Sequence, residues 1–223
     1  MMDFEIRKYE SGDRERVRWI CCETGFMGEP VEKFLLGREI FADTRTLYWT
    51  DFEPESSFVA EVEGKVVGYL LGCLDTLRQR EIFAEKIRPG IIRKSLLSSF
   101  FFRGRNWQYL LRVIRSWMRG EFRGSMKKFL VEYPAHLHTN IAPAEFRGRG
   151  IGKALIQAYL DYLRERRSKG VHLVTTSMNH AALKLYYGMG FKDLSRSRLT
   201  CYDHIIAEPL EKIVMGLKLG AGG

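Results

Sequence analysis

The chain has 223 residues, of which 45% are hydrophobic and 28% charged, and its formal net charge at pH 7 is +9. This length predicts a single domain over residues 1–223 with an added segment, and no apolar run is long enough for a transmembrane helix. The N-terminus is charged throughout, unlike a secretory signal, and the four cysteines lack metal-ligand spacing. A cytoplasmic protein without a metal site is therefore expected.

The first third of the sequence carries the pattern of a strand, two helices and a hairpin. The opening segment FEIRKYE alternates apolar and polar side chains, as a half-buried strand does. The expected elements are a strand at 4–10, amphipathic helices from Asp13 and from Pro30 to Phe41, and a hairpin at 58–74 with its turn at Glu63–Gly64.

Between residues 76 and 133 the composition becomes basic and aromatic. From Arg78 to Lys128 the chain has fourteen Lys or Arg and three Glu, a net +11, so the remaining residues together carry −2. Apolar residues between 110 and 118 have helical spacing. Breaks in the helices are expected at Pro89–Gly90, Gly104 and Gly120. We therefore expect a helical insertion at about 76–133, several times longer than an ordinary loop.

The remaining sequence alternates strands with helices. Each strand is predicted from a short β-branched or alternating run, and each helix from an apolar stripe. The expected elements are a strand at 135–142, a helix from about 151 to Gly170, a strand at 171–177, a short helix from Asn179, a strand within GMGFKDL at 188–194 and a last strand at 213–219.

The stretch FRGRGIGKAL, residues 146–155, places three glycines where a strand passes into a helix. Glycines let main-chain N–H groups approach a ligand closely, and the first N–H groups of a helix are unpaired at its positive end. Such a turn can hold a phosphate. The spacing excludes a P-loop, because no Ser or Thr follows Lys153, and a dinucleotide loop, because Lys153 replaces its third glycine.

Two motifs in this region resemble the GNAT superfamily of acyl-CoA-dependent N-acyltransferases. The loop R-G-R-G-I-G is similar to the family's R/Q-x-x-G-x-G/A, and residues 179–191 are similar to its N-x-x-A-x-x-x-Y-x-x-x-G-F segment. The strand PAHLHTNI resembles that of bacterial members related to the acetyltransferase-like domain of O-GlcNAcase. The resemblance covers Tyr133–Leu194, is only topological over residues 1–74 and is absent across the insertion.

The resemblance implies an α/β fold: a mixed, mostly antiparallel sheet of six to seven strands with helices on both faces. It implies acetyl-CoA as the cosubstrate and a small amine-bearing molecule or a peptide as the acceptor. The CoA pyrophosphate is expected on the glycine loop, and its pantetheine arm along the preceding strand end and beside the asparagine of the second motif. The expected cofactor-binding residues are Asn140, Ile141, Arg147, Gly148, Arg149, Gly150, Ile151, Gly152, Lys153 and Asn179.

The second motif also supplies a candidate acid. Asn179 and Tyr186 are seven residues apart, about two helical turns, so they lie on one face of the short helix. In the family the matching tyrosine protonates the departing CoA thiolate, and a phenol with a pKa near 10 carries the necessary proton at neutral pH. Tyr186 is therefore the expected general acid. The plainer alternatives are a core aromatic at Tyr186 and a helix N-cap at Asn179.

A base is harder to assign, because many family members have a glutamate where this chain has Val174. His136, His138 and Asn140 alternate along one strand and so point to the same face. Histidine titrates near neutral pH, which makes His136 and His138 candidate general bases. Otherwise both are hydrogen-bonded structural residues, or the amine arrives deprotonated and needs no base.

Two other functions stay open at this point. A catalytically inactive module that keeps the fold for partner binding would account for the missing glutamate and the insertion. The basic, aromatic insertion could instead bind nucleic acid or a membrane surface, against the plainer role of covering the core or lining the acceptor cleft. The sequence does not identify the acceptor or the oligomeric state, and a homodimer stays open.

Overall fold

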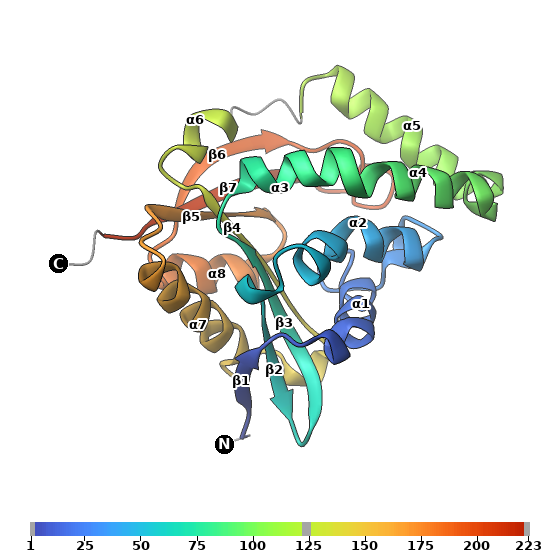
Figure 1. Ribbon diagram of the computed structural model, residues 1–223. Coiled ribbons are helices and arrows are strands. Elements are labelled where there is room, and N and C mark those ends of the chain that lie inside the picture. Colours follow the sequence, from blue (N-terminus) through green and yellow to red (C-terminus); the bar gives the residue numbers. More distant parts are fainter. Residues whose placement is uncertain (1–2, 122–125, 221–223) are drawn as a thin grey trace.

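The computed structural model describes residues 3–121 and 126–220. Its centre is a seven-stranded sheet in the order β1-β2-β3-β4-β5-β7-β6 (Figure 1). All neighbouring strands are antiparallel except β4 and β5, which are parallel, so the expected mostly antiparallel sheet is confirmed. The strands are β1 (Glu5–Lys8), β2 (Phe58–Val62), β3 (Lys65–Cys73), β4 (Ala135–Ile141), β5 (Gly170–Thr176), β6 (Lys192–Arg198) and β7 (Glu211–Lys218).

Helices cover both faces of this sheet, as predicted (Figure 1). On one face α1 (Arg14–Glu23) and α2 (Arg38–Asp51) bury their apolar stripes in one part of the core. On the other face α7 (Ile151–Glu165) and α8 (His180–Gly188) pack with the remaining strands. Strand β4 thus has a helical layer on each side, which fixes its position.

The hydroxyl of Tyr159, on α7, anchors β4 to β3. It donates to the carbonyl oxygens of Cys73 and His136 at 2.9 and 3.1 Å, and the ring is fully buried. A Cβ at Gly72 would collide with this ring, so only glycine fits at that point of β3. These contacts fix the position at which β4 begins its run toward the candidate site.

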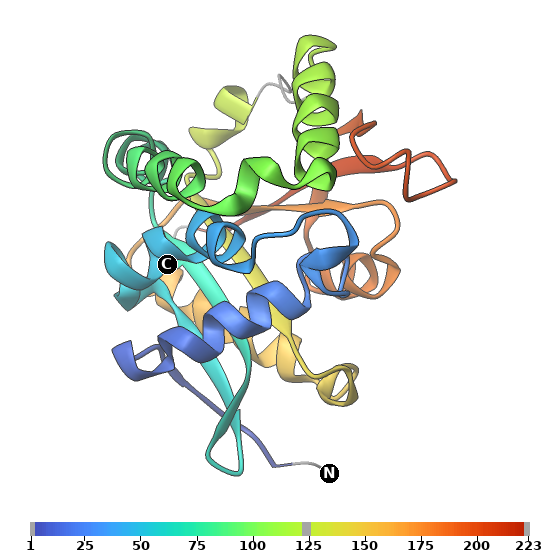
Figure 2. The ribbon, with the colours of Figure 1, turned by 90° about the vertical axis from the view of Figure 1, so that its right-hand side faces the viewer.

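The segment between β3 and β4 is helical, as expected, and its two ends meet. The N–H and hydroxyl of Thr76 both donate to the carbonyl oxygen of Pro134, at 2.9 and 2.8 Å. Figure 2 shows α5 at a steep angle to α4 on the outside of the molecule. In the described ranges, no helix combines the length and apolar character needed to cross a membrane. The helical elements are α3 (Thr76–Ile82), a π-helical turn (Phe83–Ile87), α4 (Arg88–Leu97), a 3₁₀ turn (Ser99–Phe102), α5 (Gly104–Met118) and α6 (Met126–Leu130).

The interruption expected at Pro89–Gly90 is wrong. Both residues lie in the first turn of α4, where the missing proline N–H leaves no hydrogen bond unmade, and the π-helical turn joins α3 to α4. The expected break at Gly104 is confirmed, because α5 begins there. Gly120 follows the end of α5 with φ +77°, as a glycine after a helix often does.

The helix expected from Pro30 to Phe41 is divided in two. A 3₁₀ turn covers Val31–Lys33, and α2 begins only at Arg38. In the gap, the Leu36 N–H donates to Asn106 Oδ1 at 2.8 Å and the Leu36 carbonyl accepts from Asn106 Nδ2 at 2.9 Å. Asn106 lies on α5, so a partner distant in sequence stabilises this break.

Candidate active site

Strands β4 and β5 separate soon after they begin. Their pairing is limited to Ala135 with Val171 and His136 with His172. Beyond that point β4 stays paired with β3 as far as Ile141, while β5 stays paired with β7 as far as Thr176. A wedge therefore opens between the carboxyl ends of two parallel strands, and the facing edge of β4 has no strand neighbour within the described residues.

The main-chain groups that face this wedge can be assigned from the ladder. The Ala142 N–H donates to the Val67 carbonyl at 3.0 Å, and hydrogen-bonded pairs alternate along an antiparallel ladder. Asn140 is therefore paired with β3, whereas the N–H and C=O groups of Thr139 and Ile141 face the wedge. Of the two residues expected along the pantetheine arm, Ile141 has this orientation and Asn140 does not. Thr139 has the same orientation as Ile141 and was not among the expected residues, because spacing alone does not show which edge of a strand is already paired.

The wedge contains a cavity of about 510 Å³. Its walls come from α1 and the loop after it, α2, α5, β4, β5, β7, α8 with its N-cap, and the loop after β6. It brings together five of the predicted site residues, His136, His138 and Asn140 from β4 and Asn179 and Tyr186 from α8 and its N-cap. The glycine loop is not among the lining residues and lies instead beyond the carboxyl end of β4.

The glycine loop has the open backbone that its sequence predicted. Gly148 and Gly150 have φ values of +73° and +90°, and Gly150 is the N-cap of α7. A Cβ at Gly152 would stand 3.3 Å from the Leu185 side chain. No described residue accepts a hydrogen bond from the N–H groups of Gly148 through Lys153. The loop and the first turn of α7 therefore offer consecutive unpaired donors at the positive end of a helix.

The two arginines of the loop are bonded to the protein main chain. The Arg147 N–H donates to the Ala144 carbonyl at 3.0 Å. Its guanidinium donates from Nε to the Ile141 carbonyl at 3.0 Å and from Nη2 to the Gly28 carbonyl at 2.8 Å. Arg149 Nε donates to the Glu145 carbonyl at 2.7 Å. These contacts hold the loop against β4 and against the loop that follows α1.

Tyr186 lies at the cavity with its ring packed in the core. The side chain is 7% exposed, and its ring centroid is 5.8 Å from that of Phe191. Burial raises its pKa to about 12, so the phenol is protonated at neutral pH. Within residues 3–121 and 126–220, no group accepts a hydrogen bond from its hydroxyl. The Tyr186 hydroxyl thus carries its proton at neutral pH and has no hydrogen-bond acceptor among the described residues. Asn179 also acts as the N-cap of α8, since its Oδ1 accepts from the Ala182 N–H at 3.4 Å.

The two histidines lie on the face covered by α1 and α2, as the alternation predicted. The His136 ring is 6.2 Å from that of Trp49, and the His138 ring is 5.9 Å from that of Tyr69. Burial lowers the pKa of His138 to about 4, with the Arg45 charge adding to the effect. Burial, and then the neighbouring His172, lower the pKa of His136 well below its usual value. Both rings are therefore neutral at pH 7.

The two histidines differ in whether their ring nitrogens already have a hydrogen-bond partner. His138 Nε2 lies 3.1 Å from Nδ2 of Asn140, which also donates to the Tyr69 hydroxyl at 2.8 Å. The His138 lone pair is thus already used by an amide donor. No such partner for the His136 ring nitrogens occurs among the described residues. At the position of the family's glutamate, Val174 lines the cavity with a 42% exposed side chain.

Comparison with known proteins supports the resemblance read from the two motifs. The family model described as "Acetyltransferase (GNAT) family" matches residues 110–191. The chain is 43% identical over 49 residues to N-acetyltransferase family 8 member 2 of Rattus norvegicus, a match covering 22% of this chain and 22% of that relative. The match to the family model begins at residue 110, within α5, so the expectation that the resemblance is absent across the whole insertion is wrong. The narrower likeness to the O-GlcNAcase-related members stays a prediction.

The fold is shared with solved structures over nearly the full chain. The crystal structure of a protein named SsHAT has a TM-score of 0.71 at 26% identity, covering 97% of this chain and 98% of that one. The structure of yncA from Salmonella typhimurium with its cofactor acetyl-CoA has a TM-score of 0.59 at 15% identity, covering 99% and 96%. By contrast, the alignments with six curated relatives cover 21–28% of the length of those relatives.

Proposed function

The chain belongs to the acetyltransferase (GNAT) family, and we propose that it transfers an acetyl group from acetyl-CoA to a primary amine. The observation that carries this proposal is the wedge between β4 and β5. An unpaired strand edge leads from the glycine loop to a cavity that holds an uncommitted tyrosine hydroxyl. A long thioester cosubstrate needs a phosphate site, a channel for its arm and a proton donor for its leaving thiolate, in that order.

The binding part of the proposal rests on the loop and on β4. We propose that the N–H groups of Gly148 through Lys153 bind the CoA pyrophosphate, because unpaired amides at a helix N-terminus favour an anion. The N–H and C=O of Thr139 and the N–H of Ile141 then pair with the pantetheine arm, as a neighbouring strand would, while the Ile141 carbonyl accepts from Arg147 Nε. Arg147 positions the loop, since its amide and guanidinium are already bonded to main-chain carbonyls.

The proposed reaction is a direct transfer. The neutral amine attacks the thioester carbonyl, and main-chain N–H groups at the open edge of β4 stabilise the oxyanion that forms. The C–S bond then breaks, and Tyr186 gives its proton to the departing thiolate. The attacking nitrogen loses a proton as the amide product forms, and one proton from solvent restores the phenol.

The proton on the attacking nitrogen has one candidate acceptor in the cavity. His136 is neutral and its ring nitrogens have no described partner, whereas the His138 Nε2 already accepts from Asn140. Because both histidines have lowered pKa values, neither holds a proton firmly at pH 7. We propose that the amine enters in its neutral form and that His136 passes the released proton to solvent.

The compartment is also a proposal. The four cysteines, Cys21, Cys22, Cys73 and Cys201, are free and buried, and burial raises the pKa of each thiol. Unbridged thiols are typical of reducing compartments. We therefore propose a cytoplasmic location for the described part of the chain.

A single assay tests the function. Purified protein is incubated with acetyl-CoA and a panel of primary amines, and free thiol is measured alongside mass spectrometry of the amine products. We expect amine-dependent thiol release and an acetylated product. A protein that binds CoA in calorimetry but releases no thiol with any amine would instead be an inactive binding module. Absence of CoA binding would contradict both.

A further inference from the structure

We propose that the acceptor carries a carboxylate close to its amine, as an amino acid does; this inference rests on the proposed function. The basis is the charge of the acceptor cavity. None of the described residues that line it is Asp or Glu, and its charged lining residues are Arg45 and Lys212. A cationic acceptor such as a polyamine would meet only like charge there, whereas an anionic group would meet two cations.

Of the two cations, Arg45 is better placed to bind the carboxylate of the acceptor. It lies one helical turn from Phe41 and Trp49 on α2, and all three side chains line the cavity. Within the described part of the chain, no carboxylate lies within ion-pair distance of its guanidinium. Its guanidinium lies over the Phe41 ring, with its carbon 5.7 Å from the ring centroid. An arginine fork of this kind matches a carboxylate with two parallel hydrogen bonds.

The acidic residues of α2 do not compensate Arg45. Asp43 pairs with Arg18 and Lys94, and Glu39 pairs with the same two cations, on another face of the helix. Asp51 pairs with Arg14. Among the described residues, Arg45 is therefore the cation of α2 that has no carboxylate partner, and its side chain lines the cavity.

Lys212, the second cation, and the nearby Glu121 do not change the positive charge of the cavity lining. Lys212 Nζ donates to the main-chain carbonyl of Glu121 at 3.0 Å. The Glu121 carboxylate does not line the cavity and accepts from the N–H and hydroxyl of Thr200 at 2.8 and 2.7 Å. The acceptor amine then has neutral neighbours in His136 and His138, while its carboxylate has Arg45. Such a site binds the amine without stabilising its protonated form.

Matched pairs of acceptors test this inference. Histidine is compared with histamine, tyrosine with tyramine, phenylalanine with phenethylamine, and arginine with agmatine, so each pair differs only in a carboxylate. We expect the amino acid of at least one pair to be acetylated with the higher kcat/KM. In Arg45→Gln, KM for that amino acid should rise about 10- to 100-fold, as for a lost hydrogen bond to a charged group. KM of this variant for the corresponding decarboxylated amine should change little.

Two variants sharpen the result. Arg45→Lys should recover part of the loss, and Arg164→Gln, which changes an exposed arginine on α7, should behave like the parent protein. Preference for the decarboxylated amine throughout the panel would overturn the inference while leaving the acetyl transfer intact. If no amine releases thiol, the proposed function fails, and quenching of tryptophan fluorescence that is lost in Trp49→Phe still decides the charge question. Equal quenching by both members of each pair would then contradict it.

A separate observation concerns the outer face of α5. Trp107, Leu111, Ile114 and Met118 recur at intervals of three and four residues, and their side chains are 48, 47, 49 and 63% exposed. The opposite side of the helix holds the buried Asn106 and Ser116. This stripe is an apolar helix face directed away from the core.

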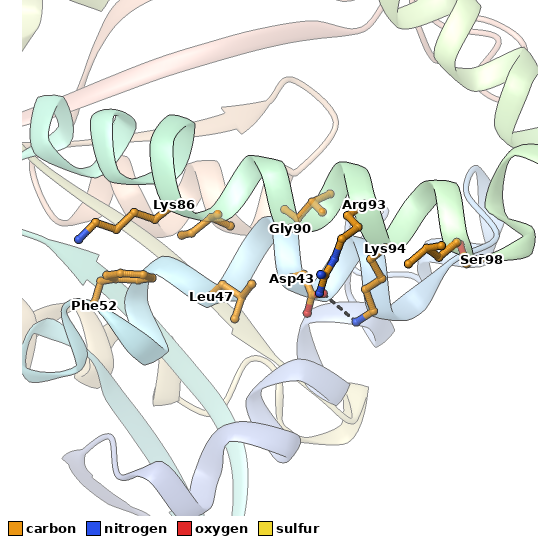
Figure 3. A pocket seen from close by; sticks show the side chains of 11 residues that line it. Asp43, Leu47, Phe52, Lys86, Gly90, Arg93, Lys94 and Ser98 are labelled. Atoms are coloured by element: carbon orange, nitrogen blue, oxygen red, sulfur yellow. Dashed lines mark hydrogen bonds and ion pairs between the residues drawn. The ribbon is translucent and has the colours of Figure 1, made fainter.

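The stripe lies in an unusually basic stretch. From Lys86 to Gly120 the sequence has nine Lys or Arg and no Asp or Glu. Arg112, Arg115 and Arg119 fall on one flank of the α5 stripe. The groove between α2 and α4 also mixes basic and apolar side chains, with Lys86 over the Phe52 ring and Lys94 paired with Asp43 (Figure 3).

We infer that α5 lies on an anionic membrane surface, with its stripe in the headgroup region and its arginines against lipid phosphates. A tryptophan beside aliphatic residues suits that interface. A second copy of the chain would bring like-charged flanks together, and a nucleic acid would leave Leu111, Ile114 and Met118 without a matching surface.

Vesicle sedimentation tests this inference, with phosphatidylcholine vesicles compared with vesicles that contain about one-third phosphatidylserine. We expect binding to the anionic vesicles that weakens at high salt. Leu111→Asp with Ile114→Asp should weaken it about tenfold or more, whereas Leu77→Asp, an exposed apolar residue on α3, should not. Circular dichroism checks that both variants stay folded.

Three results would overturn the membrane inference. One is equal or absent binding to both kinds of vesicle. Another is a protein dimer that the stripe variant dissociates. The third is RNA binding that depends on the stripe while vesicle binding does not.

Discussion

Arg147 joins the glycine loop to the loop after α1, because its Nη2 donates to the Gly28 carbonyl at 2.8 Å while its Nε donates to the Ile141 carbonyl at 3.0 Å. Gly28 and Ile141 belong to segments far apart in sequence, and Gly28 lines the candidate cavity. One side chain therefore sets the distance between the proposed phosphate site, the end of β4 and the acceptor wall.

This arrangement predicts that Arg147 acts through its geometry and not through its charge. Arg147→Ala and Arg147→Lys should each lower CoA affinity about tenfold, as for lost hydrogen bonds of a charged group, since the donors of a lysine all sit on one nitrogen and cannot reproduce the spacing of Nε and Nη2. Calorimetry with CoA measures the effect. Parent-like affinity in Arg147→Lys would show that charge alone is sufficient.

Gly150 should be essential for the phosphate site. It caps α7 with φ +90°, a backbone conformation that a β-branched residue adopts only with strain. Gly150→Val should therefore abolish CoA binding, because the N–H groups of the loop could no longer converge. The control is Gly12→Ala, where an added Cβ meets nothing within 4 Å. Unchanged CoA affinity in a folded Gly150→Val protein would place the cradle elsewhere.

Tyr186→Phe keeps the ring and removes only the proton donor. General acids contribute about 10²–10⁴-fold to rate, so turnover should fall by that factor while acetyl-CoA affinity stays within a few-fold. Tyr187→Phe is the matched control, since the Tyr187 hydroxyl is exposed and bonded to Asp193. If Tyr186→Phe turns over at the parent rate, the tyrosine is a packing residue and water protonates the thiolate.

The lowered pKa of His138 makes stability depend on pH. The folded protein holds the ring neutral with a pKa of about 4, whereas an unfolded histidine titrates near 6.5. The unfolded state therefore binds more protons in this window, so the stabilising contribution is complete above about pH 6.5 and is lost as the pH falls toward 4. Urea unfolding at several pH values should show a shallower loss for His138→Gln than for the parent protein.

The control for this titration is His180→Gln, which changes an exposed histidine at the start of α8. Its pH dependence should follow that of the parent protein. Equal slopes for His138→Gln and the parent would mean that the ring is as easily protonated in the folded state as in the unfolded state.

Asn106 should be a stability determinant although it lies outside the cavity. Its side chain is fully buried and bonds the Leu36 N–H, the Leu36 carbonyl and the Phe100 carbonyl. Asn106→Ala leaves these groups without a partner and should lower the free energy of unfolding by about 1–3 kcal/mol. Gln108→Ala, on the exposed side of the same helix, should change it little. Equal midpoints in urea would contradict the assignment.

Much of the site follows from local spacing. Glycines at 148 and 150 fix a turn with positive φ values, and the strand period places His136 and His138 on one face. The offset between Asn179 and Tyr186 puts both at one cavity. These features depend on residues a few positions apart, so the sequence by itself determines them.

Other features were decided only by the tertiary structure. The wedge depends on where β4 and β5 separate while β5 stays paired with β7, and the β3–β4 register leaves Thr139, not Asn140, at the open edge. The break before α2 depends on Asn106, and the bonds of Arg147 depend on Gly28. Each is a hydrogen bond or strand pairing between segments distant in sequence. No local pattern encodes them, because their geometry exists only once the helices pack on the sheet.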